Sequence, residues 1–143
     1  MPYEFLDDIA TADVAFEASG NTVDEMFIAA CDATMNVMVS DLGTIADVER
    51  RVLRVKNDAV DMLLFDLLQE IIFFKDAEQL LLRISHLAVA DNGEELEVTA
   101  RAYGETLDPQ KHDLVVDVKA VTLHRYRVEQ TSRGWEATVI LDI

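Results

Sequence analysis

The second half of the sequence contains several strand-like segments with no helix between them, and this limits the possible folds more than any other feature. Residues 79–90 and 97–102 are rich in leucine and β-branched residues, and Asp91-Asn92-Gly93 between them is a strong hairpin turn. Strands joined by hairpins pair antiparallel, which is typical of α+β rather than alternating βαβ folds. The other strand-like segments are residues 3–8, 13–18, 47–56, 114–123 and 135–143.

Two apolar stripes predict two long helices. Thr22-Val23-Asp24-Glu25 has the pattern of a capping box, and apolar residues recur every three or four positions from there to about Ser40. Cys31 falls in or beside this stripe, so we expect a buried thiol. A second, broader stripe starts after Asn57 or Asp58, either of which could cap it, and ends near Lys75.

These elements together predict one α+β domain over residues 1–143. It should hold a mostly antiparallel or mixed sheet of about six or seven strands, with the two long helices packed on one sheet face. A chain of 143 residues is long enough to bury its own core. The longest apolar runs are far shorter than the ~20 residues of a membrane span. With acids at the start of the chain and a single cysteine, we expect a cytoplasmic protein.

The charge is strongly negative and unevenly distributed. The chain has 12 Lys and Arg against 28 Asp and Glu, a net charge of −16, and residues 1–49 contain 11 acids and no Lys or Arg. Nucleic-acid binding depends largely on basic side chains, so direct binding of RNA or DNA is not expected. The acid excess is compatible with a cation site, a basic protein partner or adaptation to high salt, and composition alone does not choose among these.

Common enzyme signatures are absent from the sequence, which has no glycine-rich phosphate loop, nucleophile elbow or paired metal-ligand cysteines. The candidates that remain are acids at strand ends, because hard cations need oxygen ligands from separate segments. Asp13 stands at a strand entry, and Asp142 with the Ile143 carboxylate stands at the end of the last strand. His112, in a polar loop, is the histidine best placed for an exposed role.

Matching segments across nearly the whole chain resemble the archease family. They are Phe5-Leu6-Asp7, Thr11-Ala12-Asp13-Val14, Ala102-Tyr103-Gly104-Glu105 with Asp108, Lys111 and His112, Asp117-Val118-Lys119-Ala120-Val121-Thr122 with His124, and Leu141-Asp142-Ile143. Ala10 and Ala15 stand where the family usually has His and Gly, and Leu123 where it often has Tyr.

The resemblance implies a non-catalytic protein cofactor of the tRNA-splicing RNA ligase, an enzyme that depends on GTP and manganese. Proteins of this family promote guanylylation of the ligase and its multiple turnover. The resemblance also implies a divalent-cation site made by Asp13, Asp142 and the Ile143 carboxylate. The expected cation is calcium, and magnesium or manganese could take its place when the protein functions. Lys119 and His112 are weaker candidates for contact with the partner or a phosphate.

Two other function classes stay open at this point. A general chaperone-like interaction module would bind through an exposed apolar patch and would not need Asp13 or Asp142. An independent metal-dependent hydrolase would need a base and an open pocket beside the same acids. The expected partner is the ligase, with no membrane association, and the protein itself is expected to be a monomer or a weak oligomer.

Overall fold

The computed structural model describes residues 2–6 and 13–143. Asp7, Asp8 and Ala10, which carry part of the sequence-based predictions, lie outside these residues. The elements are β1 (Tyr3–Leu6), β2 (Asp13–Gly20), α1 (Val23–Met38), the short 3-10 helix η1 (Leu42–Thr44), β3 (Glu49–Asn57), α2 (Val60–Glu78), β4 (Leu80–Asp91), β5 (Leu96–Thr106), β6 (Ala120–Thr131) and β7 (Gly134–Asp142).

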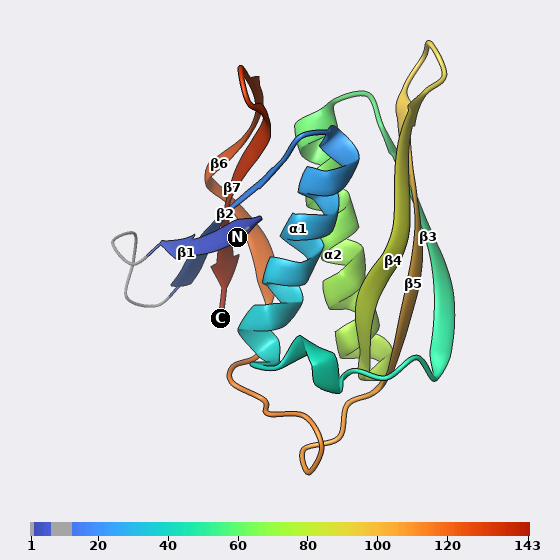
Figure 1. Ribbon diagram of the computed structural model, residues 1–143, viewed down its shortest axis with the longest axis vertical. Helices are drawn as coiled ribbons and strands as arrows, with labels where there is room; N and C mark the ends of the chain where they lie inside the picture. The colour runs from blue at the N-terminus through green and yellow to red at the C-terminus, as the bar shows by residue number, and fades with distance from the viewer. Residues whose placement is uncertain (1, 7–12) are drawn as a thin grey trace.

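The described strands form two antiparallel sheets, one with the order β1-β2-β7-β6 and one with the order β3-β5-β4. Figure 1 shows both helices between the two sheets, and α1 contacts β2, β7 and β4 while α2 contacts all three strands of the smaller sheet and β6. The predicted α+β class, the two long helices and the expected six or seven strands are confirmed, with seven strands among the described residues. The strands are divided between two sheets, however, and do not form one.

Burial on more than one side of each helix explains this three-layer arrangement. In α1 the buried residues include the neighbouring pairs Met26-Phe27 and Ala29-Ala30, and in α2 they include Leu63-Leu64, Leu67-Leu68 and Ile71-Ile72. Adjacent residues point in directions about 100° apart on a helix, so these pairs make each apolar surface wide. One sheet covers only part of such a surface, and the second sheet covers the rest.

The predicted capping box at the start of α1 is confirmed, whereas the predicted cap of α2 is wrong. Thr22 Oγ1 accepts the Glu25 amide at 3.2 Å, and Glu25 Oε2 reaches back to the Asn21 amide at 2.8 Å. The N-cap of α2 is Ala59, which makes no side-chain cap. Asn57 still supports this helix start, because its Oδ1 accepts the Ala59 amide at 3.1 Å.

The predicted hairpin over β4 and β5 is confirmed, and Cys31 is buried as expected. The predicted strand over residues 114–123 is wrong for its first six residues, because β6 begins only at Ala120. Residues 107–119 instead form an extended connection with a single bridge between Val39 and Leu114. This connection crosses the end of the molecule where α1 and α2 terminate (Figure 1).

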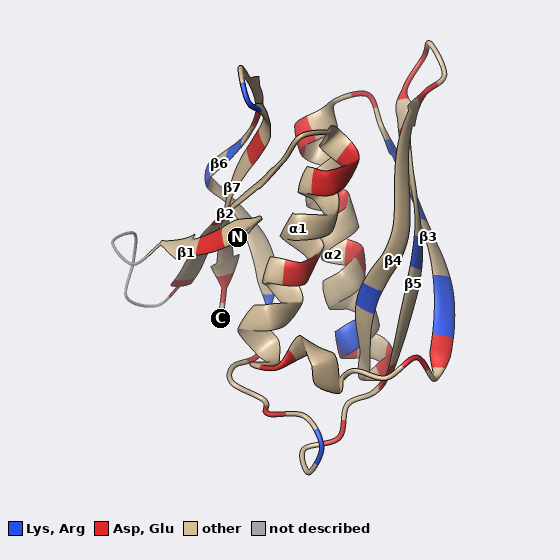
Figure 2. Ribbon diagram, in the orientation of Figure 1, with Lys and Arg blue, Asp and Glu red and all other residues tan. Residues whose placement is uncertain are grey.

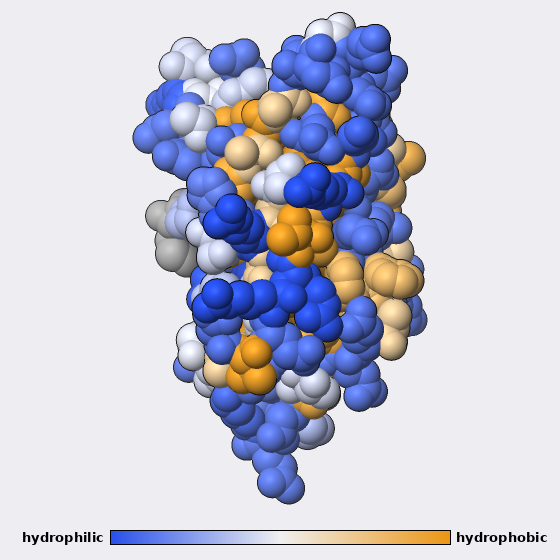
Figure 3. Space-filling model, turned by 90° about the vertical axis from the view of Figure 1, so that its right-hand side faces the viewer, coloured by the Kyte–Doolittle hydropathy of each residue, from blue (hydrophilic) through white to orange (hydrophobic). Residues whose placement is uncertain are grey.

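Basic residues are frequent on β3 and also occur on β6, on α2 and in the connection before β6, while acids are spread over both sheets and both helices (Figure 2). On β3, Arg50 pairs with Asp47 at 3.0 Å and Arg51 pairs with Glu78 at 3.1 Å. Figure 3 shows the outer face of the smaller sheet, where hydrophilic side chains separate the exposed hydrophobic ones. Neither helix of the described residues combines the length and apolar character that a membrane span needs.

Candidate functional site

Three strands of the larger sheet meet at one edge and bring the predicted acids together. Asp13, the first residue of β2, is the register partner of Asp142, the last residue of β7. Ala120, the first residue of β6, pairs with Asp142 from the other side. Lys119, one residue earlier, donates its backbone N–H to the Asp142 carbonyl oxygen at 2.8 Å. The start of β2, the end of β7 and the start of β6 therefore form one acidic edge.

Asp13 and Asp142 project from the same face of the sheet. Residues directly opposite each other in an antiparallel pair share a face, with Cβ atoms about 5 Å apart. Phe16 and Leu141 belong to the core, so alternation along the strands places both carboxylates on the face away from the helices. Two like charges directly opposite destabilise a pair of strands, and a cation between them would remove that repulsion.

The donors at this edge fit a hard cation. Carboxylate oxygens are the preferred ligands of calcium and magnesium. Thr122 lies on the same face, two register positions away from Asp142, and its hydroxyl oxygen is buried with no hydrogen-bond partner among the described residues. Within the described ranges no three His, Cys, Asp or Glu side chains converge. A cation held here would therefore need main-chain or water oxygens beside the two carboxylates.

Ile143 follows Asp142 and anchors the end of β7. Its side chain is half-buried and packs against the core. This packing holds the main chain of Ile143 next to the acidic edge, where its predicted role is that of a carboxylate ligand. The structure thus brings Asp13, Asp142 and Ile143 together, and their binding of a cation stays a prediction.

The two weaker candidates are placed differently. Lys119 is exposed and lies beside the acidic edge, although it precedes β6 and is not inside a strand. The expectation that His112 is exposed is wrong, because its side chain is fully buried. Burial follows from the loop conformation, in which the His112 ring turns inward to bond Asp108 and Glu105.

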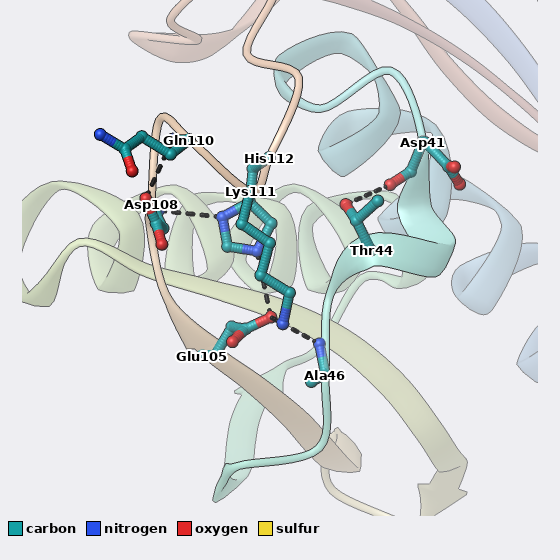
Figure 4. Close-up of polar contacts among 8 residues, drawn as sticks. All are labelled: Asp41, Thr44, Ala46, Glu105, Asp108, Gln110, Lys111 and His112. Atoms are coloured by element: carbon teal, nitrogen blue, oxygen red, sulfur yellow. Dashed lines mark hydrogen bonds and ion pairs between the residues drawn. The ribbon is translucent and has the colours of Figure 1, made fainter.

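Glu105 is the centre of a polar cluster that fixes the connection before β6 (Figure 4). Its Oε2 accepts hydrogen bonds from Lys111 Nζ at 2.6 Å, from the Ala46 amide at 2.8 Å and from His112 Nε2 at 3.1 Å. His112 Nδ1 accepts the Asp108 amide at 2.9 Å, so Nε2 carries the proton in the neutral ring. The hydrogen bond from Lys111, with those from Ala46 and His112, lowers the pKa of Glu105 to about 2.

A buried lysine fixes the other end of this connection. Lys75 of α2 donates to the carboxylates of Asp76 and Asp117 and, at 2.8 Å, to the Val118 carbonyl oxygen. Burial acts to lower the pKa of Lys75, but the bonds to Asp117 and Asp76 outweigh it and raise that pKa. No sequence pattern predicts these roles of Lys75 and Glu105, because local patterns do not show tertiary contacts.

Fold and site together define a class of small α+β proteins, in which two helices lie between two antiparallel sheets and distant strands place two carboxylates at one edge. Comparison with known proteins makes this class specific. A model of the Archease protein family (MTH1598/TM1083) matches residues 3–143. The chain belongs to the archease family.

Relatives and solved structures agree with this membership. The protein archease of Pyrococcus abyssi is 31% identical over 134 residues, covering 93% of this chain and 94% of the relative. That of Methanosarcina mazei is 32% identical over 142 residues, covering 99% and 95%. The solution structure of protein 1598 of Methanobacterium thermoautotrophicum has a TM-score of 0.85 with 30% identity over 99% of both chains. The crystal structure of a Thermotoga maritima archease, described as a possible chaperone, has a TM-score of 0.56 with 22% identity over 98% of both chains and shows the fold alone.

Proposed function

We propose that this protein is a non-catalytic cofactor of a tRNA-splicing RNA ligase in the cytoplasm. It promotes guanylylation of the GTP- and manganese-dependent ligase and allows it to act over multiple turnovers. Family membership supports the proposal. The observation that carries it is the direct register pairing of Asp13 with Asp142 at a sheet edge, because it gives an activator a place to hold a cation.

In this proposal Asp13, Asp142 and the Ile143 carboxylate hold one divalent cation, either calcium, magnesium or manganese. The cation supplies positive charge that can help to position a nucleoside triphosphate. The carboxylates bind and orient it, and Lys119 beside them offers a further contact for a phosphate. The net charge of −16 speeds association with a basic partner and makes that association sensitive to salt.

The test is multiple-turnover RNA ligation by the cognate ligase with substrate in excess. Wild-type protein should carry the ligase past one turnover, and Asp13→Asn and Asp142→Asn should each abolish that stimulation. Glu136→Gln is the matched control, because Glu136 is a half-buried carboxylate at the other end of β7. It should stimulate as wild type does. Calorimetric titration with Mn²⁺ and Ca²⁺ should show loss of binding in the two Asp variants only.

The same experiment separates the alternatives. If all variants stimulate equally, the ligase role stands and the cation site is rejected. If wild-type protein raises ligation only by keeping the ligase soluble, without raising the guanylylated fraction, a chaperone-like role without metal replaces the proposal. Phosphoester hydrolysis by the protein alone would indicate an independent enzyme.

A further inference from the structure

Three consecutive apolar residues are exposed in the connection that leads to the acidic edge. Leu114 and Val116 are each 38% exposed, and Val115 is 57% exposed. Exposed hydrophobic residues are ordinary when they are scattered, whereas contiguous ones indicate an interaction surface. The other large exposed hydrophobic residues of the described chain are Phe5, Val48, Val52, Phe73 and Leu123, and no two of these are adjacent in sequence.

The three apolar residues line a hollow that extends the apolar surface. It has a volume of about 240 Å³, and Val115 and Val116 line it together with Met38, Leu81 and Leu107. The Lys75–Asp117 ion pair closes one side. Apolar side chains that are exposed and also line an apolar hollow can interdigitate with a complementary protein surface.

The backbone of this segment is held in place, although it belongs to no strand. The Val115 amide donates to the Met38 carbonyl oxygen at 2.9 Å, and Lys75 Nζ donates to that of Val118 at 2.8 Å. Ser40 Oγ donates to Asp113 Oδ2 at 2.6 Å. A surface that is already ordered loses little conformational entropy on binding, which favours affinity. These contacts therefore hold the backbone of the segment in one conformation.

The charges around the segment select the partner. Asp113 precedes the apolar residues and is exposed, whereas Asp117, which follows them, is already paired with Lys75. A complementary surface therefore has an apolar pocket with a basic residue at the end that faces Asp113. The segment also leads directly to the acidic edge, because Lys119, three residues after Val116, bonds Asp142 through its amide. A partner bound here would lie next to the candidate cation site.

We propose that residues 113–117 are the docking surface for the ligase, on which they occupy an apolar pocket with a basic residue placed to meet Asp113. This inference rests on the proposed function and adds to it a division of labour between two neighbouring surfaces. Residues 113–117 supply affinity, and the acidic edge supplies activation.

The test measures binding and stimulation separately for variants matched in exposure. Val115→Ser should raise the Kd for the purified ligase about tenfold, as measured by calorimetry. This is the change expected when an apolar anchor that is buried in an interface is truncated. Val52→Ser is the control, because Val52 is also 57% exposed but lies on β3 in the smaller sheet. It should bind as wild type does. Asp113→Asn keeps an acceptor for Ser40 and removes one charge, so it should reduce the salt dependence of the Kd.

Stimulation distinguishes docking from activation. At a concentration that saturates the ligase, Val115→Ser should stimulate ligation as much as wild-type protein does. Asp142→Asn should bind the ligase with the wild-type Kd but give no stimulation. If Val115→Ser binds the ligase with the wild-type Kd, the proposed docking surface is wrong, even if the proposed function is correct. Failure of the wild-type protein to bind the ligase rejects both. If Val115→Ser instead converts a wild-type dimer into a monomer by light scattering, the segment contacts a second copy of this chain and the assignment to the ligase is wrong.

Discussion

Replacing Glu105 by alanine should destabilise the protein by about 3 kcal/mol, because one carboxylate serves three donors. His112 is the main contributor, since its side chain is fully buried and its Nε2–H would lose its acceptor. An unsatisfied buried donor costs about 1–3 kcal/mol. Lys111 is 43% exposed and can turn to water, so its loss adds less than about 1 kcal/mol. The Ala46 amide also loses its acceptor, and this loss accounts for the rest of the destabilisation.

Urea denaturation followed by circular dichroism measures this change, and for a chain of 143 residues it corresponds to a fall in Tm of about 10 °C. Glu105→Gln keeps an acceptor oxygen without the charge and should lose about 1 kcal/mol. Glu97→Ala is the control on the same strand, where the contact to Lys56 is 4.0 Å long, and it should change stability by less than about 0.5 kcal/mol. Equal losses in Glu105→Ala and Glu97→Ala would refute the reasoning.

The pH dependence gives an independent check on Glu105. Its pKa is lowered from 4.5 to about 2, so the folded state favours the charged form. The stabilisation is therefore fully present above pH 4.5 and is lost as the pH falls towards 2. The difference in stability between wild type and Glu105→Gln should be constant between about pH 5 and 8 and should shrink below pH 4.5. A difference that grows on acidification would contradict this assignment.

Three further predictions concern the core and the helix start. Gly104→Ala should prevent folding or cost more than about 4 kcal/mol, because a Cβ there would lie 1.6 Å from the Leu81 carbonyl oxygen; near-native melting would exclude this close approach. Thr22→Ala should lower the unfolding free energy by about 1 kcal/mol in urea, and an unchanged midpoint would show that the cap adds nothing. Burial raises the pKa of the Cys31 thiol, so it should react with Ellman's reagent at pH 8 only after denaturation; fast labelling of native protein would contradict its burial.

The hairpin, the capping box and both helices could be predicted because each depends on neighbouring residues. The separation into two sheets could not, because β2 pairs with β7 across almost the whole chain and no local pattern specifies that partner. Residues 114–119 were expected to form a strand on their content of valine and leucine. Long-range hydrogen bonds to the Met38 carbonyl oxygen and from Lys75 hold the backbone of residues 114–119 in another conformation. No local sequence pattern predicts these hydrogen bonds.

The candidate site was predictable in part. Asp13 and Asp142 were selected as acids at strand ends, and the structure places them opposite each other. The resemblance to archeases supplied their combination with Ile143, because spacing along the chain does not show which strand ends meet. The burial of His112 could not be predicted from its polar loop, since it depends on the turn that brings the ring to Glu105.

The pairing of β2 with β7 also determines when the acidic edge can form in a growing polypeptide. Asp13 and Asp142 lie near opposite ends of the sequence, so Asp13 leaves the ribosome long before its register partner is made. At synthesis rates of roughly 5–20 residues per second, this interval lasts about 10 s. The smaller sheet and both helices lie between the two residues and can assemble first. A nascent chain would therefore carry no paired carboxylates until β7 is added, and cation binding would report that the larger sheet is complete.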